Sequence, residues 1–129
     1  MDKKTGGLII INTIEKLEVI VRAADDRLAQ DIMALDVAQL TPLADYFVVM
    51  DAKNDRQLAA IVDEITTVAH KNNFDLKNVE GKSGGKWVLI DMNDIIVHVF
   101  HYSERANYNL EKIWQDAPLV DIKDWVTEQ

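Results

Sequence analysis

The chain has 129 residues, enough for one folded domain with a buried core, and its 48% hydrophobic and 28% charged residues are ordinary for a globular protein. It contains no Cys, which excludes disulfides, thiolate zinc sites and cysteine nucleophiles. The formal net charge of −8 weighs against direct nucleic-acid binding, which depends on clustered Lys and Arg, and favours a basic protein partner.

The first predicted element is a helix over residues 8–24, where apolar residues recur at steps of three and four. The apolar cluster at its start is short and is soon followed by charged residues. It does not fit a signal peptide or a membrane span, so we expect a cytoplasmic protein. Two strands are expected next. Residues 32–37 are short and apolar, and residues 45–51 are rich in aromatic and β-branched side chains.

Helical periodicity returns over residues 54–72. Asn54 is the predicted N-cap, because its side chain can accept from the free backbone N–H groups of the first turn, and Gln57 completes a box-like cap. The following residues 73–86 are polar and contain glycines, which predicts a loop.

The segment WVLIDMNDIIVHVFH, residues 87–101, predicts two strands joined by a tight turn at residues 92–94. Ser103 is the expected cap of a short last helix that runs through Trp114 and is ended by Pro118. The order helix, strand, strand, helix, strand, strand, helix favours a mixed β-sheet with flanking helices, in the α/β or α+β class.

We expect one domain over residues 1–117 and a C-terminal tail over residues 118–129. The tail carries Ile122 and Trp125, two apolar side chains that could order part of it.

Two histidines fall in the last predicted strand. Side chains alternate between the faces of a sheet, so His98 shares a face with Ile96 and Phe100, while His101 points to the opposite face. The pair therefore cannot converge on one metal ion unless the strand bends. We predict that His98 is a hydrogen-bonded, half-buried residue; its usefulness near neutral pH leaves a catalytic role as the alternative.

Two carboxylates flank the predicted turn. Asp91 and Asp94 could converge as paired catalytic groups do, but Asp beside a turn is also the ordinary cap of free backbone donors, and we favour the cap. The stretch GKSGGK is not a phosphate-binding loop, because Leu76 stands where that motif begins with Gly.

Several large or polar side chains are not needed to pack strands, and they include the residue types that dominate protein interfaces. They are Trp87, Asp91, Asp94, His98, Arg105, Tyr108, Glu111 and Trp114. An aromatic sheet face with an acidic rim would suit a basic partner. The alternative is that Trp87 and Trp114 fill the core beneath the strands.

The segments ADYFVVM, DRQLAAIVDEI, WVLIDMNDIIVHVFH and ERANYNLEKIW resemble, in content, order and spacing, those of the Iojap family of ribosomal silencing factors. The resemblance covers roughly residues 8–117. Its most specific part is a combination of Trp87, Asp91, Asp94, the segment Val97-His98-Val99-Phe100, Arg105, Tyr108, Leu110, Glu111 and Trp114.

This resemblance implies a small α/β fold of nucleotidyltransferase-like shape without the catalytic residues, and a protein that is not an enzyme and needs no cofactor. Members of the family bind large-subunit ribosomal protein fourteen on the face of the large ribosomal subunit that meets the small subunit. Occupying that face blocks subunit joining and lowers translation, above all when nutrients are short.

Carried onto this sequence, the resemblance implies a partner-binding set of Trp87, Leu89, Asp91, Met92, Asp94, His98, Arg105, Tyr108, Glu111 and Trp114. The chain departs from the family pattern at four positions. Met92 and Asn93 stand where Tyr and Gly are usual in the turn, and Ala52 and Asn54 stand where Gly and Ser are usual before the second helix.

Two other functions remain open from the residues alone. One is a metal-dependent enzyme of nucleotidyltransferase-like shape, in which Asp91 and Asp94 hold the ion. The other is a structural module that dimerises through the paired strands, since an exposed aromatic sheet face tends to find a partner and also favours a homodimer of the silencing factor.

Overall fold

The computed structural model describes residues 12–81, 85–106, 112 and 114–127. The elements follow in the order α1 (Thr13–Asp26), β1 (Gln30–Asp36), β2 (Tyr46–Ala52), α2 (Asp55–Lys71), β3 (Asn78–Glu80), β4 (Trp87–Asp91), β5 (Ile95–His101), α3 (Tyr102–Arg105) and the 3-10 turn η2 (Lys123–Trp125).

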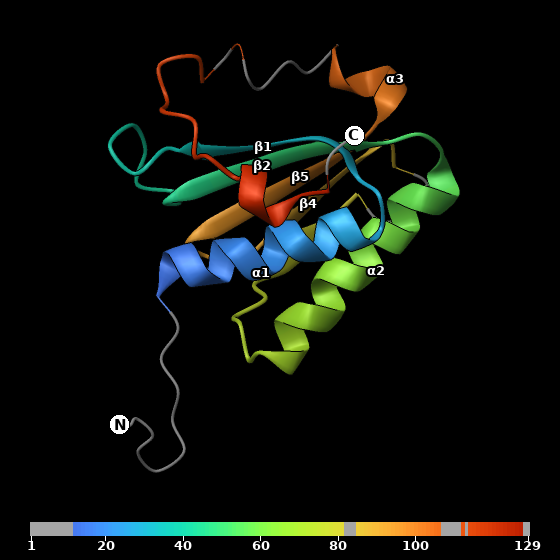
Figure 1. Cartoon of the computed structure of the whole chain (residues 1–129), viewed down its shortest axis with the longest axis horizontal. Coiled ribbons are helices and arrows are strands. Elements are labelled where there is room, and N and C mark those ends of the chain that lie inside the picture. Colours follow the sequence, from blue (N-terminus) through green and yellow to red (C-terminus); the bar gives the residue numbers. More distant parts are fainter. Residues whose placement is uncertain (1–11, 82–84, 107–111, 113, 128–129) are drawn as a thin grey trace.

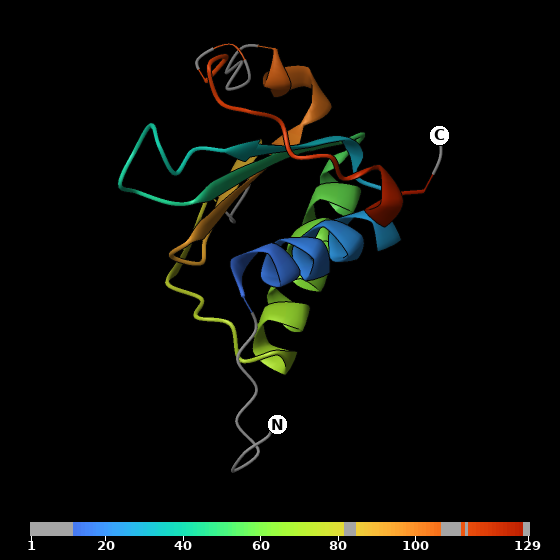
Figure 2. The ribbon, with the colours of Figure 1, turned by 60° about the vertical axis from the view of Figure 1, so that its left-hand side comes forward.

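The five strands form one mixed sheet in the order β1-β2-β5-β4-β3. β2 and β5 are parallel, and the other neighbours pair antiparallel. Figures 1 and 2 show α1 and α2 together on one side of the sheet and α3 on the opposite side. The expected mixed sheet with flanking helices is confirmed.

The main core lies between the sheet and the two long helices. β4 places Val88 and Ile90 there, and they belong to the same buried cluster as Leu17 and Ile20 of α1 and Ile61 of α2. Each such side chain contributes about 1.5–3 kcal/mol when it is fully buried. The period of two in β4 therefore separates a helix-covered face from a second face that carries Trp87, Leu89 and Asp91.

Both long helices begin at asparagine caps. Asn12 and Glu15 form a reciprocal capping box at the start of α1, and residues 8–11 of the predicted helix lie outside the described residues. At α2, the Asn54 side chain accepts from the backbone N–H of Gln57 at 2.8 Å, as expected. The Gln57 side chain accepts from the backbone N–H of Lys53 at 2.7 Å, one residue earlier than a standard box.

Two expectations about local structure were wrong. The predicted loop contains a short edge strand, β3, which pairs with β4 from Asn78 to Glu80. The last helix begins at Tyr102 rather than after Ser103, because the His101 side chain is the cap and accepts from the backbone N–H of Ser103. The predicted extension of this helix to Trp114 falls largely on residues that are not described.

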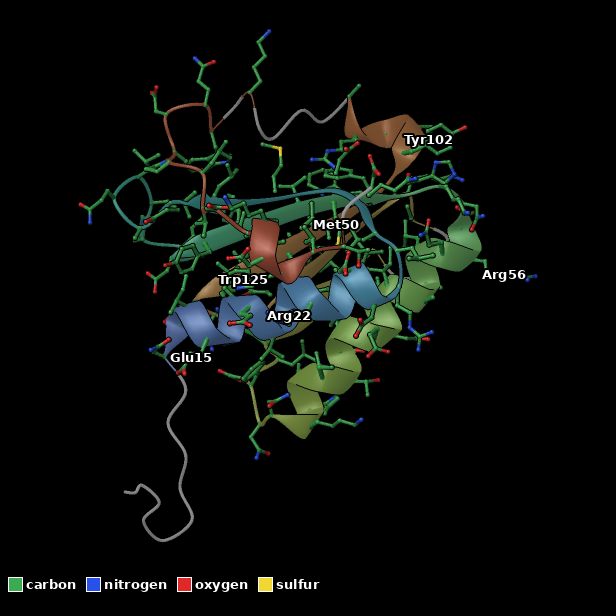
Figure 3. All side chains as sticks on the ribbon, viewed as in Figure 1. Glu15, Arg22, Met50, Arg56, Tyr102 and Trp125 are labelled. Atoms are coloured by element: carbon green, nitrogen blue, oxygen red, sulfur yellow. The ribbon has the colours of Figure 1, made fainter. Side chains whose placement is uncertain are left out.

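The C-terminal tail lies along the free edge of β1 and then over α1. Pro118 accepts at its carbonyl from the backbone N–H of Asp36, and the N–H of Val120 donates to Ala34, each at 2.9 Å. Trp125 packs against the main core, and Figure 3 shows it beside Arg22 of α1. The tail is therefore ordered over Ile122 and Trp125, as those residues predicted.

Candidate functional site

The sheet face opposite α1 and α2 carries a cluster of rings, and we call it the aromatic face: Phe47, Trp87, His98, Phe100 and Trp114. Trp87 stacks on Phe100 with ring centroids 5.1 Å apart. Phe47 meets both His98 and Trp114 edge-on, at 5.3 and 5.2 Å. Such arrangements suit the ring quadrupoles and add about 0.5–1.5 kcal/mol per pair beyond area burial.

His98 holds Trp87 in place. The indole Nε1–H of Trp87 donates to His98 Nδ1 at 3.1 Å, which confirms the predicted hydrogen bond. His98 is 5% exposed and therefore more buried than expected. Burial lowers the pKa of His98 to about 4, so the ring is neutral near pH 7.

The two histidines lie on opposite sides of the sheet, as strand alternation predicted. His101 Nε2 lies 3.9 Å from a carboxylate oxygen of Asp55 at the start of α2. His98 contacts the rings of the aromatic face instead. Within the parts of the chain that the structure describes, no three His, Asp or Glu side chains are grouped to hold a metal ion.

Asp91 and Asp94 are held by different partners. Asp91 Oδ1 accepts from the backbone N–H of Asn93 at 2.9 Å and so caps the turn, as expected. Asn93 takes the left-handed conformation of the turn with φ 71°, which Asn tolerates well. Asp94 forms an ion pair with Lys16 of α1 at 2.6 Å and accepts from the Thr13 hydroxyl at 3.2 Å.

The Asp94 ion pair joins α1 to the turn between β4 and β5. Lys16 is 8% exposed, and its ammonium also donates to the carbonyl of Met92 at 3.0 Å. A carboxylate that is committed to a lysine and a hydroxyl on the helix side is poorly placed to share a metal ion with Asp91. This geometry gives no support to paired-carboxylate catalysis.

A shallow pocket of about 220 Å³ opens beside Trp87 and is lined by Glu80, Gly81, Trp87 and Leu89. Gly81 has φ +83°, and a Cβ there would collide with the carbonyl oxygen of Trp87, so glycine is required. Trp87 and Leu89 are half-buried, and Glu80 adds an exposed carboxylate at the rim. This combination suits an apolar stem that ends in a positive charge.

Sequence reasoning did not find Glu80 and Gly81, because the residues around them indicated only a flexible loop. The signal that could have found them is the glycine directly after a short alternating segment, because glycine beside a strand often marks a close approach of two backbones.

The structure places other members of the predicted partner-binding set in different environments. Met92 belongs to the predicted partner-binding set, but its side chain is fully buried in the main core, so the turn does not present it at the surface. Arg105 lies 3.6 Å from Asp51 with 11% of its side chain exposed, and it braces α3 against β2. Tyr108 and Glu111 lie outside the described residues.

Comparisons with known proteins all point to one family. The model of the family described as "Ribosomal silencing factor during starvation" matches residues 11–129. A ribosomal silencing factor RsfS from Bacillus subtilis is 45% identical over 106 residues, which are 82% of this chain and 90% of the relative. The chloroplastic protein Iojap of Zea mays is 28% identical over 80% of this chain, which spans 45% of that longer protein.

Two solved structures have the same architecture. A crystal structure from Bacillus halodurans matches with a TM-score of 0.76 and 38% identity, covering 84% of this chain and 99% of that one. A protein of Chromobacterium violaceum matches with a TM-score of 0.79 and 28% identity, covering 81% of this chain and 88% of that one.

Proposed function

Because the chain belongs to the family of ribosomal silencing factors, we propose that it is a cytoplasmic repressor of translation that binds the large ribosomal subunit and sterically blocks joining of the small subunit. The observation that carries the proposal is the family match over residues 11–129, together with 45% identity to a silencing factor. The partner on the large subunit is ribosomal protein fourteen, as the resemblance implied.

The proposed contact centres on Trp87, Leu89 and Asp91, which β4 places next to one another on the aromatic face. Trp and an adjacent aliphatic side chain supply contact area, and Asp91 with Glu80 supplies negative charge toward a basic ribosomal protein. The proposed contact does not include Met92, His98, Asp94 and Arg105, because their side chains are buried or are held by other parts of the fold. Those four residues support the surface from within.

The surface is preorganised for binding. Trp87 is fixed between Phe100, on which it stacks, and His98, to which it donates. A side chain that is already held in one rotamer loses little conformational freedom on association, so more of its contact energy appears as affinity. This favours a stable binding surface over a reaction site that must open and close.

The first test is co-sedimentation of the purified protein with isolated large and small ribosomal subunits, followed by addition of the missing subunit. We expect the protein to pellet only with the large subunit and to lower the yield of joined ribosomes. Absence from both pellets would contradict the proposal. Binding without any loss of joined ribosomes would contradict steric blocking in particular.

A Trp87→Ala variant tests the contact surface. Removing a central aromatic anchor should weaken binding to the large subunit by about tenfold or more, because such residues dominate interface energetics. Trp125→Ala is the matched control, since Trp125 is also half-buried but packs beside α1, on the other side of the sheet. Circular dichroism should show both variants folded. Equal affinity of a folded Trp87→Ala variant and the wild type would exclude this surface.

A further inference from the structure

The loop over residues 37–45, between β1 and β2, is a firmly anchored projection. Val37 and Ala44 at its base are 0% and 6% exposed and pack with Phe47 and Ile96. The backbone N–H of Val37 closes the base by donating to the carbonyl of Asp45 at 2.9 Å. The loop therefore leaves the sheet in a fixed direction.

The tip of this loop is also ordered by its own hydrogen bonds. The N–H groups of Leu40 and Thr41 both donate to the carbonyl of Val37, at 2.9 and 3.0 Å. The N–H of Leu43 donates to the Thr41 hydroxyl at 3.1 Å. The turn presents two leucines to solvent, Leu40 at 46% and Leu43 at 68% exposure. Figures 1 and 2 both show the loop projecting beyond the end of the sheet.

The surroundings of the two leucines are negative. The loop and its two ends, residues 36–45, contain two Asp and neither Lys nor Arg. Asp36 and Asp45 stand at the two ends of the loop, and both, after burial, raise the pKa of Tyr46 next to them. An exposed apolar pair with a negative border is complementary to an apolar patch that has a basic rim.

The loop is continuous with the proposed contact. The backbone N–H groups of Asp45 and Tyr46 both donate to the carbonyl of Asp94, at 2.8 and 3.1 Å. Asp94 belongs to the turn that follows Asp91 on β4. Backbone hydrogen bonds thus join the base of the loop to the turn that follows Asp91, the acidic residue of the proposed contact. They fix the position of the loop relative to that contact.

We propose that the loop over residues 37–45 is a second docking element for the large subunit: Leu40 and Leu43 insert against a basic protein of that subunit, with Asp36 and Asp45 facing its Lys and Arg side chains. This inference rests on the proposed function and extends it, because it makes the contact bipartite. The proposed partner of the loop is a protein surface that has an apolar centre and a basic rim.

Charge favours a protein surface over two other partners of the loop, ribosomal RNA and a second copy of this chain. Ribosomal RNA presents phosphates, which the carboxylates would repel. A second copy of this chain also carries a net charge of −8, and like-charged surfaces disfavour association. A basic ribosomal protein satisfies both the apolar and the charged parts of the loop.

The test measures the affinity of three variants for purified large subunits. Leu40→Ser with Leu43→Ser should weaken binding about tenfold, because it removes two apolar contacts from an otherwise unchanged loop. Asp36→Asn with Asp45→Asn should weaken binding and flatten its salt dependence. Leu28→Ser is the matched control, since Leu28 is 65% exposed but lies between α1 and β1, and we expect wild-type affinity.

The outcomes separate the two proposals. If the wild type does not bind large subunits, the proposed function fails first. If it binds and the folded Leu40→Ser, Leu43→Ser variant binds equally well, the second docking element is overturned. Tighter binding after Asp36→Asn with Asp45→Asn would overturn it in favour of RNA. A wild-type dimer that the leucine variant converts to a monomer, in analytical ultracentrifugation, would overturn it in favour of self-association.

Discussion

Lys16 shows how one residue can join two elements that are distant in sequence. Its ammonium donates to the Asp94 carboxylate and the Met92 carbonyl, and it lies 5.3 Å from the centre of the Phe74 ring. A buried ammonium costs desolvation energy, which these partners offset. Lys16 therefore positions the turn after β4 against α1.

Replacing Lys16 by Met tests this role. The substitution keeps much of the apolar stem but removes the ammonium that donates to Asp94 and to the Met92 carbonyl, and these acceptors keep only the Thr13 hydroxyl and the backbone N–H of Asp94. We therefore expect the free energy of unfolding to fall by about 2 kcal/mol. Urea denaturation measures this change in the free energy of unfolding. Arg22→Met is the control, because Arg22 and Glu18 form an exposed i,i+4 pair, whose loss costs less than about 0.5 kcal/mol. Equal losses in the two variants would refute the buried role of Lys16.

His98 makes stability depend on pH. The folded state lowers its pKa to about 4, while an unfolded histidine titrates near about 6.5. The unfolded chain therefore binds more protons between these values. The contribution of His98 is fully present above about pH 6.5, is lost as the pH falls toward 4, and changes no further below that.

We expect this single residue to account for about 3 kcal/mol of lost stability between pH 6.5 and pH 4. Denaturation of the wild type and of His98→Gln at several pH values in this range isolates it, because the carboxylates titrate alike in both proteins. The difference in the free energy of unfolding should shrink as the pH falls. Two parallel pH profiles would show that the ring is not held neutral by burial.

At the scale of elements, the start of α2 was the best predicted feature. Asn54 caps α2 as expected, because capping depends on residues within one turn of each other. Asn54→Ala should lower the free energy of unfolding by about 1 kcal/mol, whereas Asn54→Asp, which keeps the acceptor, should stay close to the wild type. Thermal denaturation compares the two. Similar losses from both substitutions would mean that the cap contributes little.

Whether the sequence predicted a strand depended on the length of that strand. β2, β4 and β5 carry enough residues for apolar alternation or β-branched content to stand out, and their approximate positions were predicted. β3 has three residues, too few for a period, and it exists because β4 offers it a pairing edge. The start of α3 was misplaced because His101 serves both as the last residue of β5 and as the cap.

At the scale of the whole molecule, the negative charge has a use in the proposed function. Attraction to a basic ribosomal protein should speed association, and salt should screen it. We expect affinity for the large subunit to fall as ionic strength rises, measured by co-sedimentation at increasing salt. Trp87→Ala should bind more weakly at each salt concentration but keep the same salt dependence. Binding that strengthens with salt would argue against a charge-guided contact.

The predicted partner-binding set illustrates what a motif can and cannot specify. Trp87, Leu89 and Asp91 share one face because a strand alternates, and this was accessible from sequence. The burial of Met92 and the pairing of Arg105 with Asp51 depend on elements far away in the chain. A family motif keeps both kinds of residue, whether they contact a partner or support the fold.

The sequence by itself determined the mixed fold, the Asn54 cap of α2, the opposite faces of His98 and His101, the acidic character and the family. These follow from local periodicity, capping chemistry and composition, all of which act over a few residues. Tertiary structure decided that Asp94 is committed to Lys16, that Gly81 shapes a pocket at Trp87, and that the tail closes the edge of β1. Each of these joins segments that are distant in the chain or that only the sheet brings together, so the packed fold alone establishes which side chains remain at the surface.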